Sequence, residues 1–458
     1  MIRLIEGPVW LHDFAARGWT RRLSRPRLVA RQQRRFRRLA EFVWNRSPFY
    51  RQIMLQRGLR PEHCQPGDFP IVTKSDLIER FDEMVTSPAL SRARIRDFLE
   101  RSTRPTELLD GRYYILRSSG TSGNYACVAY SWREWIRGTS HQIRFAGGLR
   151  LRKRCAFIGC TNGHFAGATL GLTGQRGINR LLYDCRGFHV GRPLDELVEE
   201  LNAFQPHLVS GYAATLCQLA LEQAAGRLAI HPFRIVNSGE PLTATNGQFI
   251  EDTFRARIAD VWACSEMLFM GASGAAGGPM TLYEDDLILE LFDDHVLVTN
   301  LFNRTTPLIR YRINDVLAPA NGHGTDGPFR QVAGIAGRNE RHLHFRNNDG
   351  SDESVAPYLF MTLPLDGISE LQVHQHDECR FTLNVRMHAA LSSSGIADAL
   401  DQANRQVNRL LAGKQLERSV GFTIQVVERL PVDPVSGKAR FVVCDCSDQR
   451  PGKHGRAA

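Results

Sequence analysis

Six small or hydroxylated residues follow one another between two apolar segments, in the stretch RSSGTSGNYACVAY that spans residues 117–130. Glycine permits backbone conformations that turn several N–H groups toward one anion, and serine and threonine add hydroxyl donors. The run therefore indicates a phosphate-binding loop, with a serine-rich flexible turn as the alternative. It matches neither the lysine-containing loop of P-loop NTPases nor the Gly-x-Gly-x-x-Gly dinucleotide pattern. Its residues are Ser118, Ser119, Gly120, Thr121, Ser122 and Gly123.

A lysine near the end of the chain is a second candidate for chemistry. Lys438 follows a glycine in PVSGKARFVV, in a chain whose basic residues are almost all arginine. A compact ammonium can follow negative charge as it moves during a reaction, whereas a planar guanidinium suits fixed bidentate pairing. A surface lysine in a Pro/Gly turn is the alternative.

The elements that must position these residues alternate between strand and helix from about residue 112 to residue 266. Short β-rich runs such as CAFIGC and FRIVNSG are separated by amphipathic helical segments, which predicts a parallel sheet with crossover helices. Ligands of such sheets gather at the carboxyl ends of the strands, where the Gly/Ser-rich turns would lie. The predicted fold class is α/β.

Two domains are expected from the length of 458 residues and from the change in pattern along the chain. We predict a large layered N-terminal domain over residues 1–336, with a mostly helical lead-in over 1–100 and a β-rich portion that includes a hairpin at DDH. A small, mobile α+β domain is predicted over 337–445, followed by a flexible tail over 446–458.

Composition narrows the class of protein. The net charge of +10 comes largely from an arginine-rich segment over 21–38, which predicts a helix with a solvated charged face. An acidic partner or an anionic membrane surface is an alternative partner for this face, and nucleic acid is not expected. The absence of a long apolar run or a secretion signal, together with ten scattered cysteines, predicts a cytoplasmic protein without a transmembrane segment.

Six motifs in order resemble those of the adenylate-forming (AMP-dependent synthetase/ligase) superfamily. The closest similarity is to its phenylacetate–CoA ligase-like branch, which includes capsule-biosynthesis and cofactor-adenylating relatives. The resemblance covers nearly the whole chain and departs from the family pattern at Asn124, where the family usually has lysine. The motifs are SSGTSGN, NSGEPL, DVWACSE, PLIRYRINDV, GRNER and SGKARFVV.

The resemblance implies a role for each motif residue. The serine–glycine run would hold the β- and γ-phosphates of ATP, Ser265 would contact phosphate and Glu266 would be the magnesium ligand. Lys438 would be the catalytic lysine and Glu340 the hinge between the domains. The other residues expected at the nucleotide are Gly239, Glu240, Pro241, Asp260 and Trp262 around adenine, Asp315 at the ribose, and Arg338.

The implied function is ATP-dependent, AMP-forming activation of a small carboxylic acid through an acyl-adenylate. A thiol, either coenzyme A or the phosphopantetheine of an acyl carrier protein, would then accept the acyl group. The expected cofactors are ATP and Mg²⁺. Two alternatives stay open: an adenylyltransferase that places AMP on a hydroxyl of a small molecule or cofactor, and a non-catalytic protein that keeps the fold.

Overall fold

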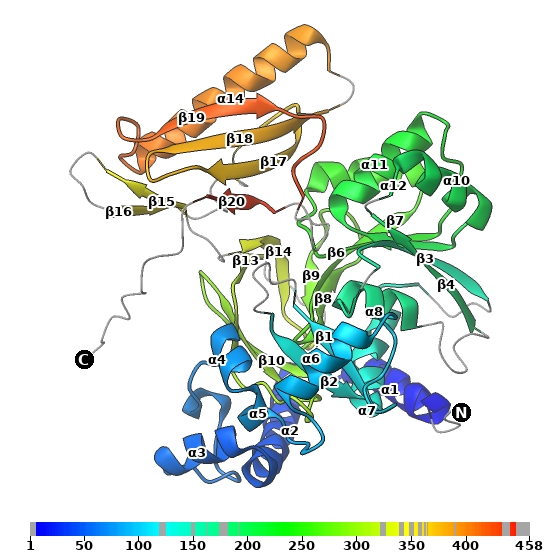
Figure 1. The fold of residues 1–458 in the computed structure, drawn as a ribbon, viewed down its shortest axis with the longest axis vertical. Helices are drawn as coiled ribbons and strands as arrows, with labels where there is room; N and C mark the ends of the chain where they lie inside the picture. The colour runs from blue at the N-terminus through cyan, green and yellow to red at the C-terminus, as the bar shows by residue number, and fades with distance from the viewer. Residues whose placement is uncertain are drawn as a thin grey trace. The chain divides into compact units, whose positions relative to one another are not determined.

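The computed structural model divides the chain into two compact units, one ending at Ala336 and the other beginning at Gly337 (Figure 1). The residues that the structure describes are 6–118, 125–147, 152–161, 163–173, 182–190, 192–320, 327–338, 343–347, 352–355, 360, 363, 365–388, 391–432 and 440–445.

A nine-stranded mixed sheet forms the centre of the first unit. Its strands are β3 (Lys153–Gly159), β4 (Tyr183–His189), β5 (Leu208–Gly211), β6 (Arg234–Ser238), β7 (Arg257–Cys264), β8 (Leu268–Ser273), β9 (Met280–Leu282), β13 (Asp315–Pro319) and β14 (Gln331–Arg338). Their order across the sheet is β13-β14-β9-β8-β7-β6-β5-β3-β4. The five strands from β3 to β7 pair in parallel, whereas β8 and β9 are antiparallel.

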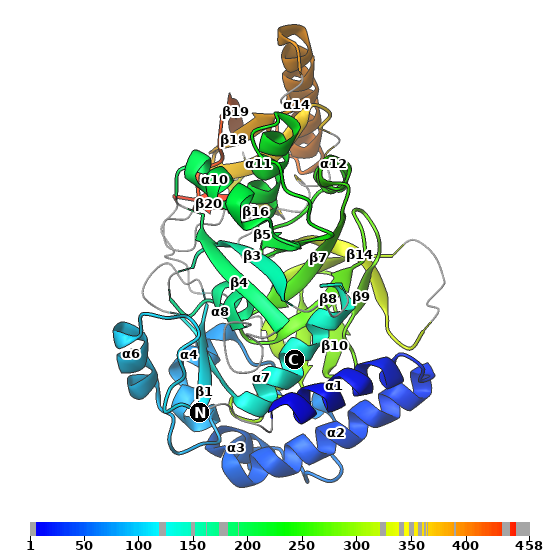
Figure 2. The ribbon, with the colours of Figure 1, turned by 90° about the vertical axis from the view of Figure 1, so that its right-hand side faces the viewer.

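Helices cover both faces of the parallel strands because successive strand residues point to opposite sides. Ile235 and Ile258 are buried under α10 (Leu194–Phe204), α11 (Ala213–Ala224) and α12 (Ala244–Phe254), whereas Val236 and Ala259 belong to the core of the other face. Figures 1 and 2 show these three helices on one side and α8 (Ala166–Leu172) on the other. The predicted α/β class with crossover helices is confirmed.

The first hundred residues of the first unit are mostly helical. Thr73 begins one of its helices: its hydroxyl accepts from the N–H of Asp76, and the Asp76 carboxylate accepts from the N–H of Thr73 at 2.7 Å. This reciprocal pair satisfies two N–H groups that the helix leaves without partners. The helices are α1 (Glu6–Thr20), α2 (Arg25–Arg46), α3 (Pro48–Gln56), α4 (Lys74–Glu79), α5 (Phe81–Met84) and α6 (Arg92–Arg101), with a 3-10 turn, η1, at Pro66–Asp68.

Two small antiparallel sheets flank the central one. Strands β1 (Tyr113–Arg117) and β2 (Cys127–Ser131) border the serine–glycine run and lead into α7 (Trp132–Thr139) and the 3-10 turn η2 (Ser140–Arg144). The other sheet contains β10 (Leu287–Leu291), β11 (Val296–Asn300) and β12 (Tyr311–Ile313). Its β10 and β11 form the hairpin predicted at DDH, closed where the N–H of Phe292 donates to the carbonyl of His295.

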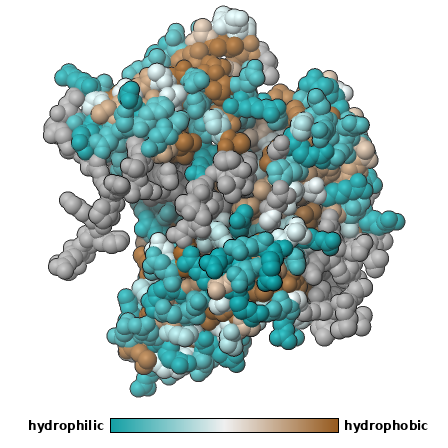
Figure 3. Space-filling view, viewed as in Figure 1, coloured by the Kyte–Doolittle hydropathy of each residue, from teal (hydrophilic) through white to brown (hydrophobic). Residues whose placement is uncertain are grey.

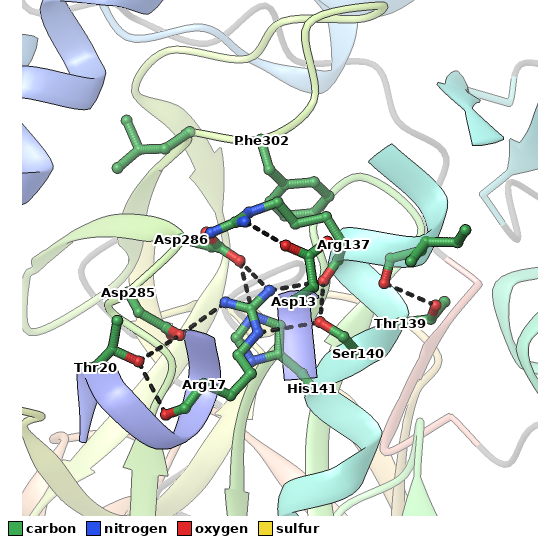
Figure 4. A network of polar contacts seen from close by, with 12 residues as sticks. Asp13, Arg17, Thr20, Arg137, Thr139, Ser140, His141, Asp285, Asp286 and Phe302 are labelled. Carbon is green, nitrogen blue, oxygen red and sulfur yellow. Dashed lines mark hydrogen bonds and ion pairs between the residues drawn. The ribbon is translucent and has the colours of Figure 1, made fainter. Parts of the chain in front are cut away.

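A buried ionic cluster ties α1 to the segment between β9 and β10 (Figure 4). Arg17 donates to Asp285 at 2.7 Å and also pairs with Asp286. Arg137, from α7, joins Asp286 at 2.8 Å to Asp13 at 2.7 Å. The side chains of Asp285 and Asp286 are 0% exposed, so the N-terminal helix is bound to the core by paired charges.

The arginine-rich helix α2 differs from the expected solvated face. Its Arg25 forms two hydrogen bonds to the Glu284 carboxylate, at 2.6 and 2.9 Å, and its Arg35 reaches Asp286 at 2.5 Å. Part of the basic excess of the N-terminus therefore neutralises acids inside this unit. Other arginines of the helix, including Arg34 and Arg38, are exposed.

A four-stranded sheet and one long helix form the second unit. The sheet contains β17 (Ile368–Gln375), β18 (Arg380–Met387), β19 (Gly421–Val426) and β20 (Val442–Cys444), in the order β19-β18-β17-β20. Helix α14 (Ser393–Gly413) buries Val407 and Leu411 with Val373 and Phe381 of the sheet. A hairpin of β15 (Leu343–Arg346) and β16 (Asp352–Val355) completes the described part of the unit.

The hydropathy of the described surface agrees with the burial of apolar side chains in these cores. Hydrophilic residues make up most of the described face in Figure 3. Among the described residues, none of the helices combines the length and the apolar character that crossing a membrane requires.

Candidate active site

The second and third motifs meet where the neighbouring parallel strands β6 and β7 lie side by side. Asn237 on β6 pairs in register with Asp260 on β7, and its amide donates to the Asp260 carboxylate at 2.7 Å. The same amide group donates to the carbonyl of Glu240 at 2.9 Å. Gly239 between them has φ +88°, a conformation that glycine adopts without strain. One asparagine thus holds both motifs together.

Asp260 and Glu240 both have protein partners at this edge. Burial raises the pKa of Asp260 to about 6, and the hydrogen bond from Asn237 opposes the rise. The Glu240 carboxylate accepts from the N–H of Ala214 at 3.1 Å, in the first turn of α11. A carboxylate is favourable there because the first N–H groups of a helix lack partners within the helix. Pro241 follows in an exposed turn before α12.

The third and fourth motifs are joined by a buried hydrogen bond. The indole N–H of Trp262 donates to the carboxylate of Asp315 at 2.6 Å, and the two residues are 1% and 4% exposed. Trp262 ends up inside the main hydrophobic core of the first unit. The stacking of Trp262 against adenine and the contact of Asp315 with ribose stay predictions. The structure adds that the indole N–H of Trp262 orients the Asp315 carboxylate.

Among the described residues, the Glu266 side chain accepts a single hydrogen bond, which leaves one carboxylate oxygen without a protein donor. The hydroxyl of Tyr311 donates to its Oε1 at 3.0 Å, and no described protein group donates to Oε2. The residue is 8% exposed. Because Mg²⁺ prefers oxygen ligands and usually keeps several waters, one carboxylate oxygen beside bound phosphates fits such an ion.

Ser265 connects the third motif to the base of the serine–glycine run. Its hydroxyl donates to the carbonyl of Arg117 at 3.1 Å, and the hydroxyl of Tyr130 donates to the Ser265 carbonyl at 2.8 Å. Next to Arg117, the N–H of Ser118 donates to the Ala126 carbonyl at 2.9 Å, and the Ser118 hydroxyl accepts from the N–H of Ala126 at 3.0 Å. Ser265 is therefore bonded to the end of β1, directly before the run, where Ser118 pairs with Ala126.

Several predicted site residues stay predictions because they lie outside the described residues. Arg338 is described only as the last residue of β14. The residues outside are Ser119, Gly120, Thr121, Ser122, Gly123, Asn124, Glu340 and Lys438.

The sequence analysis missed three residues that contact the motifs: Arg117, Tyr130 and Tyr311. The guanidinium of Arg117 lies over the ring of Phe165, 4.4 Å from its centroid, and its buried Nε has no hydrogen-bond partner among the described residues. The signals were positional, since Arg117 directly precedes the run and Tyr311 stands four residues before Asp315. These residues link the β1–β2 hairpin and β12 to the motif at the end of β7.

Similarity to known proteins extends over nearly the whole chain. No protein-family model matches it. Protein CapK of Staphylococcus aureus is 20% identical, over 96% of this chain and 95% of CapK. A crystal structure of 2-hydroxyisobutyryl-CoA ligase in the postadenylation state with 2-HIB-AMP is 18% identical, with a TM-score of 0.69, and covers 93% of this chain and 91% of that one.

A second structure of that ligase is similar as well. It contains 2-HIB-AMP and CoA in the thioesterification state, and it matches with a TM-score of 0.56 and the same coverage of both chains. At this identity the structures establish a shared fold, and the similarity to CapK runs over the full length. The predicted resemblance is thereby confirmed: the chain has the acyl-CoA ligase fold and is a distant relative of CapK over its full length.

Proposed function

We propose that this protein activates a carboxylic acid with ATP, releasing pyrophosphate, and transfers the acyl group from the adenylate to a thiol. The observation that carries the proposal is the set of hydrogen bonds that joins the motif segments of the first unit. Trp262 binds Asp315, Tyr311 binds Glu266, and Ser265 binds the base of the serine–glycine run. Residues from distant segments could bind one nucleotide together only if the fold brought them close to one another, and these hydrogen bonds join the segments that carry them.

The first half-reaction requires an in-line displacement at phosphorus. An oxygen of the substrate carboxylate forms a bond to the α-phosphorus of ATP, and the bond from that phosphorus to the bridging oxygen breaks, so pyrophosphate leaves with the electron pair. Lys438 would stabilise the negative charge that develops on the transferring group. Mg²⁺ held by Glu266 would supply charge neutralisation at the phosphates.

The second half-reaction forms the thioester. The sulfur of a thiolate attacks the carbonyl carbon of the acyl-adenylate, and the bond from that carbon to the phosphate oxygen breaks, which releases AMP. The solved 2-hydroxyisobutyryl-CoA ligase was crystallised with an acyl-adenylate and CoA together. That pairing in a protein of the same fold supports coenzyme A as the first thiol to examine here.

The decisive experiment is ATP–pyrophosphate exchange with a panel of aryl, hydroxy and aliphatic carboxylic acids. We expect exchange with at least one acid and a loss of about 10²–10³-fold in the Lys438→Ala variant, which is typical of removing a transition-state charge partner. Lys453→Ala is the matched control and should exchange at the wild-type rate. Absence of exchange with every acid, or equal rates in both variants, would reject the proposal.

A parallel assay distinguishes the thiol acceptor from a hydroxyl acceptor. With the active acid present, we expect steady AMP release to depend on added coenzyme A or pantetheine. AMP transfer to a hydroxyl compound in the absence of any thiol would instead support the adenylyltransferase alternative.

The buried Trp262–Asp315 hydrogen bond offers a structural test of the nucleotide site. Trp262→Phe keeps an aromatic ring but removes the N–H donor, and a hydrogen bond to a charged group contributes about 1.5–3 kcal/mol. We expect KM for ATP to rise about tenfold. The control is Trp135→Phe, because Trp135 is equally buried and its Nε1 has no hydrogen-bond partner among the described residues. Equal KM values for the two variants would contradict the assigned role of Asp315.

A further inference from the structure

Two histidines and an aspartate lie on one face of the sheet in the second unit. His374 is on β17, His376 directly follows that strand, and Asp445 directly follows β20. The two strands pair in parallel with His374 opposite Val443. Because side chains alternate along a strand and paired residues share a face, all three functional side chains point to the same side.

The opposite face of this sheet is the core side. Val373 and Phe381 are buried there under α14. Cys444 belongs to that side by alternation, since it pairs with Gln375, and its thiol contacts the Gln375 side chain at 3.7 Å. The cluster of His374, His376 and Asp445 is here called the imidazole–carboxylate cluster. Among the described residues of these strand ends, it offers imidazole nitrogens and carboxylate oxygens, whereas the thiol of Cys444 lies on the core side.

The ligand atoms of the cluster are close to the spacing that a metal ion requires. Nε2 of His374 and Nδ1 of His376 lie 2.8 and 3.3 Å from Oδ2 of Asp445, and all three atoms are within 4.8 Å of one another. Metal–ligand bonds of about 2.0–2.1 Å in a tetrahedral zinc site place neighbouring ligand atoms about 3.3 Å apart. Small rotations of these side chains would suffice.

The surroundings of the cluster favour a cation. The side chains of His374, His376 and Asp445 are 29%, 39% and 55% exposed, so an ion can reach them. Among the described residues no arginine or lysine pairs with Asp445. The nearby Arg380 pairs with Asp377 instead, at 2.7 Å.

A hydrogen bond with Thr382 orients the His376 side chain of the cluster. The hydroxyl of Thr382, which is paired with His374 across β18, lies 2.8 Å from Nε2 of His376. Partners of this kind fix the tautomer and the ring orientation of metal-binding histidines. With Nε2 engaged by the hydroxyl, Nδ1 is the nitrogen that faces Asp445.

We propose that His374 Nε2, His376 Nδ1 and the Asp445 carboxylate bind a divalent transition-metal ion, Zn²⁺ being the best match, with water completing the coordination. Imidazole nitrogens suit zinc, copper and nickel, whereas Mg²⁺ prefers oxygen, so this site is distinct in chemistry from the one proposed at Glu266. Lone pairs of the two nitrogens and one oxygen form the bonds, and any proton on the imidazoles is released to solvent. The bound ion would cross-link β17 to the end of β20.

The test uses the full chain without a polyhistidine tag, stripped with a chelator, and requires no enzymatic activity. Calorimetric titration with Zn²⁺ should show a site with micromolar or tighter affinity, at least tenfold weaker in His374→Gln and absent in the double variant that also carries His376→Gln. His63→Gln, which changes an exposed histidine of the first unit, is the matched control and should bind as wild type. Circular dichroism should show the same fold in all four proteins.

Cobalt provides the second measurement, because it reports ligand type. Co²⁺ bound by imidazole and carboxylate should give visible d–d bands without a thiolate charge-transfer band, and these bands should disappear in the double variant. Zinc affinity that is equal in the wild type and the double variant, or a thiolate band that persists in the latter, would place the ion at cysteines and overturn the proposal. A wild type that binds no zinc would overturn it as well.

Discussion

Two groups of histidine and aspartate in the described structure bring their ligand atoms within 4.8 Å of one another, and their surroundings are opposite. His141, Asp285 and Asp286 are buried in the first unit, whereas the imidazole–carboxylate cluster is partly exposed in the second. The buried carboxylates are surrounded by guanidinium groups, those of Arg17, Arg35, Arg137 and Arg144. In the exposed cluster the described partners of the carboxylate are imidazoles.

The difference shows that ligand spacing alone does not define a metal site. Burial raises the pKa of Asp286, but the charges of Arg137, Arg17 and Arg35 outweigh it and hold the pKa well below its usual value. An added divalent ion would have to displace these arginines and bury their charges unpaired. At Asp445 a metal would displace only protons or water, so the same residue types can serve structure in one place and bind a ligand in another.

The largest effect that sharpens this contrast is expected from Asp286→Ala. Removing one partner of a buried ionic cluster leaves the others charged and unpaired, which costs about 3–5 kcal/mol. We expect a loss of that size in the free energy of unfolding, measured by urea denaturation. Arg94→Ala, which breaks an exposed pair with Asp110, is the control and should change it by about 1 kcal/mol or less. Equal losses in the two variants would show that the buried cluster contributes no more to the free energy of unfolding than an exposed ion pair.

A pH dependence should follow from the histidine of the buried cluster. Burial, reinforced by the charge of Arg17, lowers the pKa of His141 to about 4 from 6.5. Below pH 6.5 the unfolded chain therefore binds a proton that the folded chain refuses until about pH 4, and stability falls as the pH drops through that window. The expected loss is about 3 kcal/mol.

His141→Gln isolates this contribution from those of other groups. Urea unfolding at several pH values between 7 and 4 should give a shallower decline for the variant than for the wild type. His63→Gln, an exposed histidine, should follow the wild-type curve. Parallel curves for wild type and His141→Gln would mean that His141 takes up its proton equally in both states.

The difference between the two clusters can also be tested by placing an arginine beside the imidazole–carboxylate cluster. Thr382 lies beside His376, so Thr382→Arg places a guanidinium within reach of the Asp445 carboxylate. Since that cation competes with the metal, we expect zinc affinity to fall at least tenfold in calorimetry. Thr382→Val removes the hydroxyl without adding charge and should weaken binding much less. If the Thr382→Arg variant binds zinc as tightly as the wild type, the local charge does not determine metal binding at the cluster.

The smallest effect is expected from Asp445→Asn in the absence of metal. Exposed ion pairs contribute about 0–1 kcal/mol, so the free energy of unfolding should change by no more than that. Urea denaturation in the presence of a chelator measures it. A loss as large as that of Asp286→Ala would identify Asp445 as a structural anchor instead of a ligand.

The strand and helix pattern was predictable because it depends on neighbours in the sequence. The alternation of β-rich and helical runs identified the parallel sheet, and the DDH turn identified the β10–β11 hairpin. Ordered motifs identified Asp260, Glu266 and Asp315 as candidate site residues.

The contacts that could not be predicted join residues far apart in the chain. Arg35 and Asp286 are separated by 251 positions, and no periodicity in α2 distinguishes an arginine that pairs inside from one that faces solvent. For the same reason the hydrogen bond from Trp262 to Asp315 was not foreseen, since it depends on where β7 and β13 are placed by the sheet. Local pattern specifies the elements, whereas topology specifies their charge partners.

The distance along the chain between Arg17 and Asp285, 268 positions, has a consequence for how the protein is made. At about 5–20 residues per second, the ribosome needs on the order of 10–50 seconds to add the intervening residues. During that time the first helices of the nascent chain lack the acids that will neutralise them. Helix α1 therefore cannot complete its buried ion pairs until long after its own residues have been made.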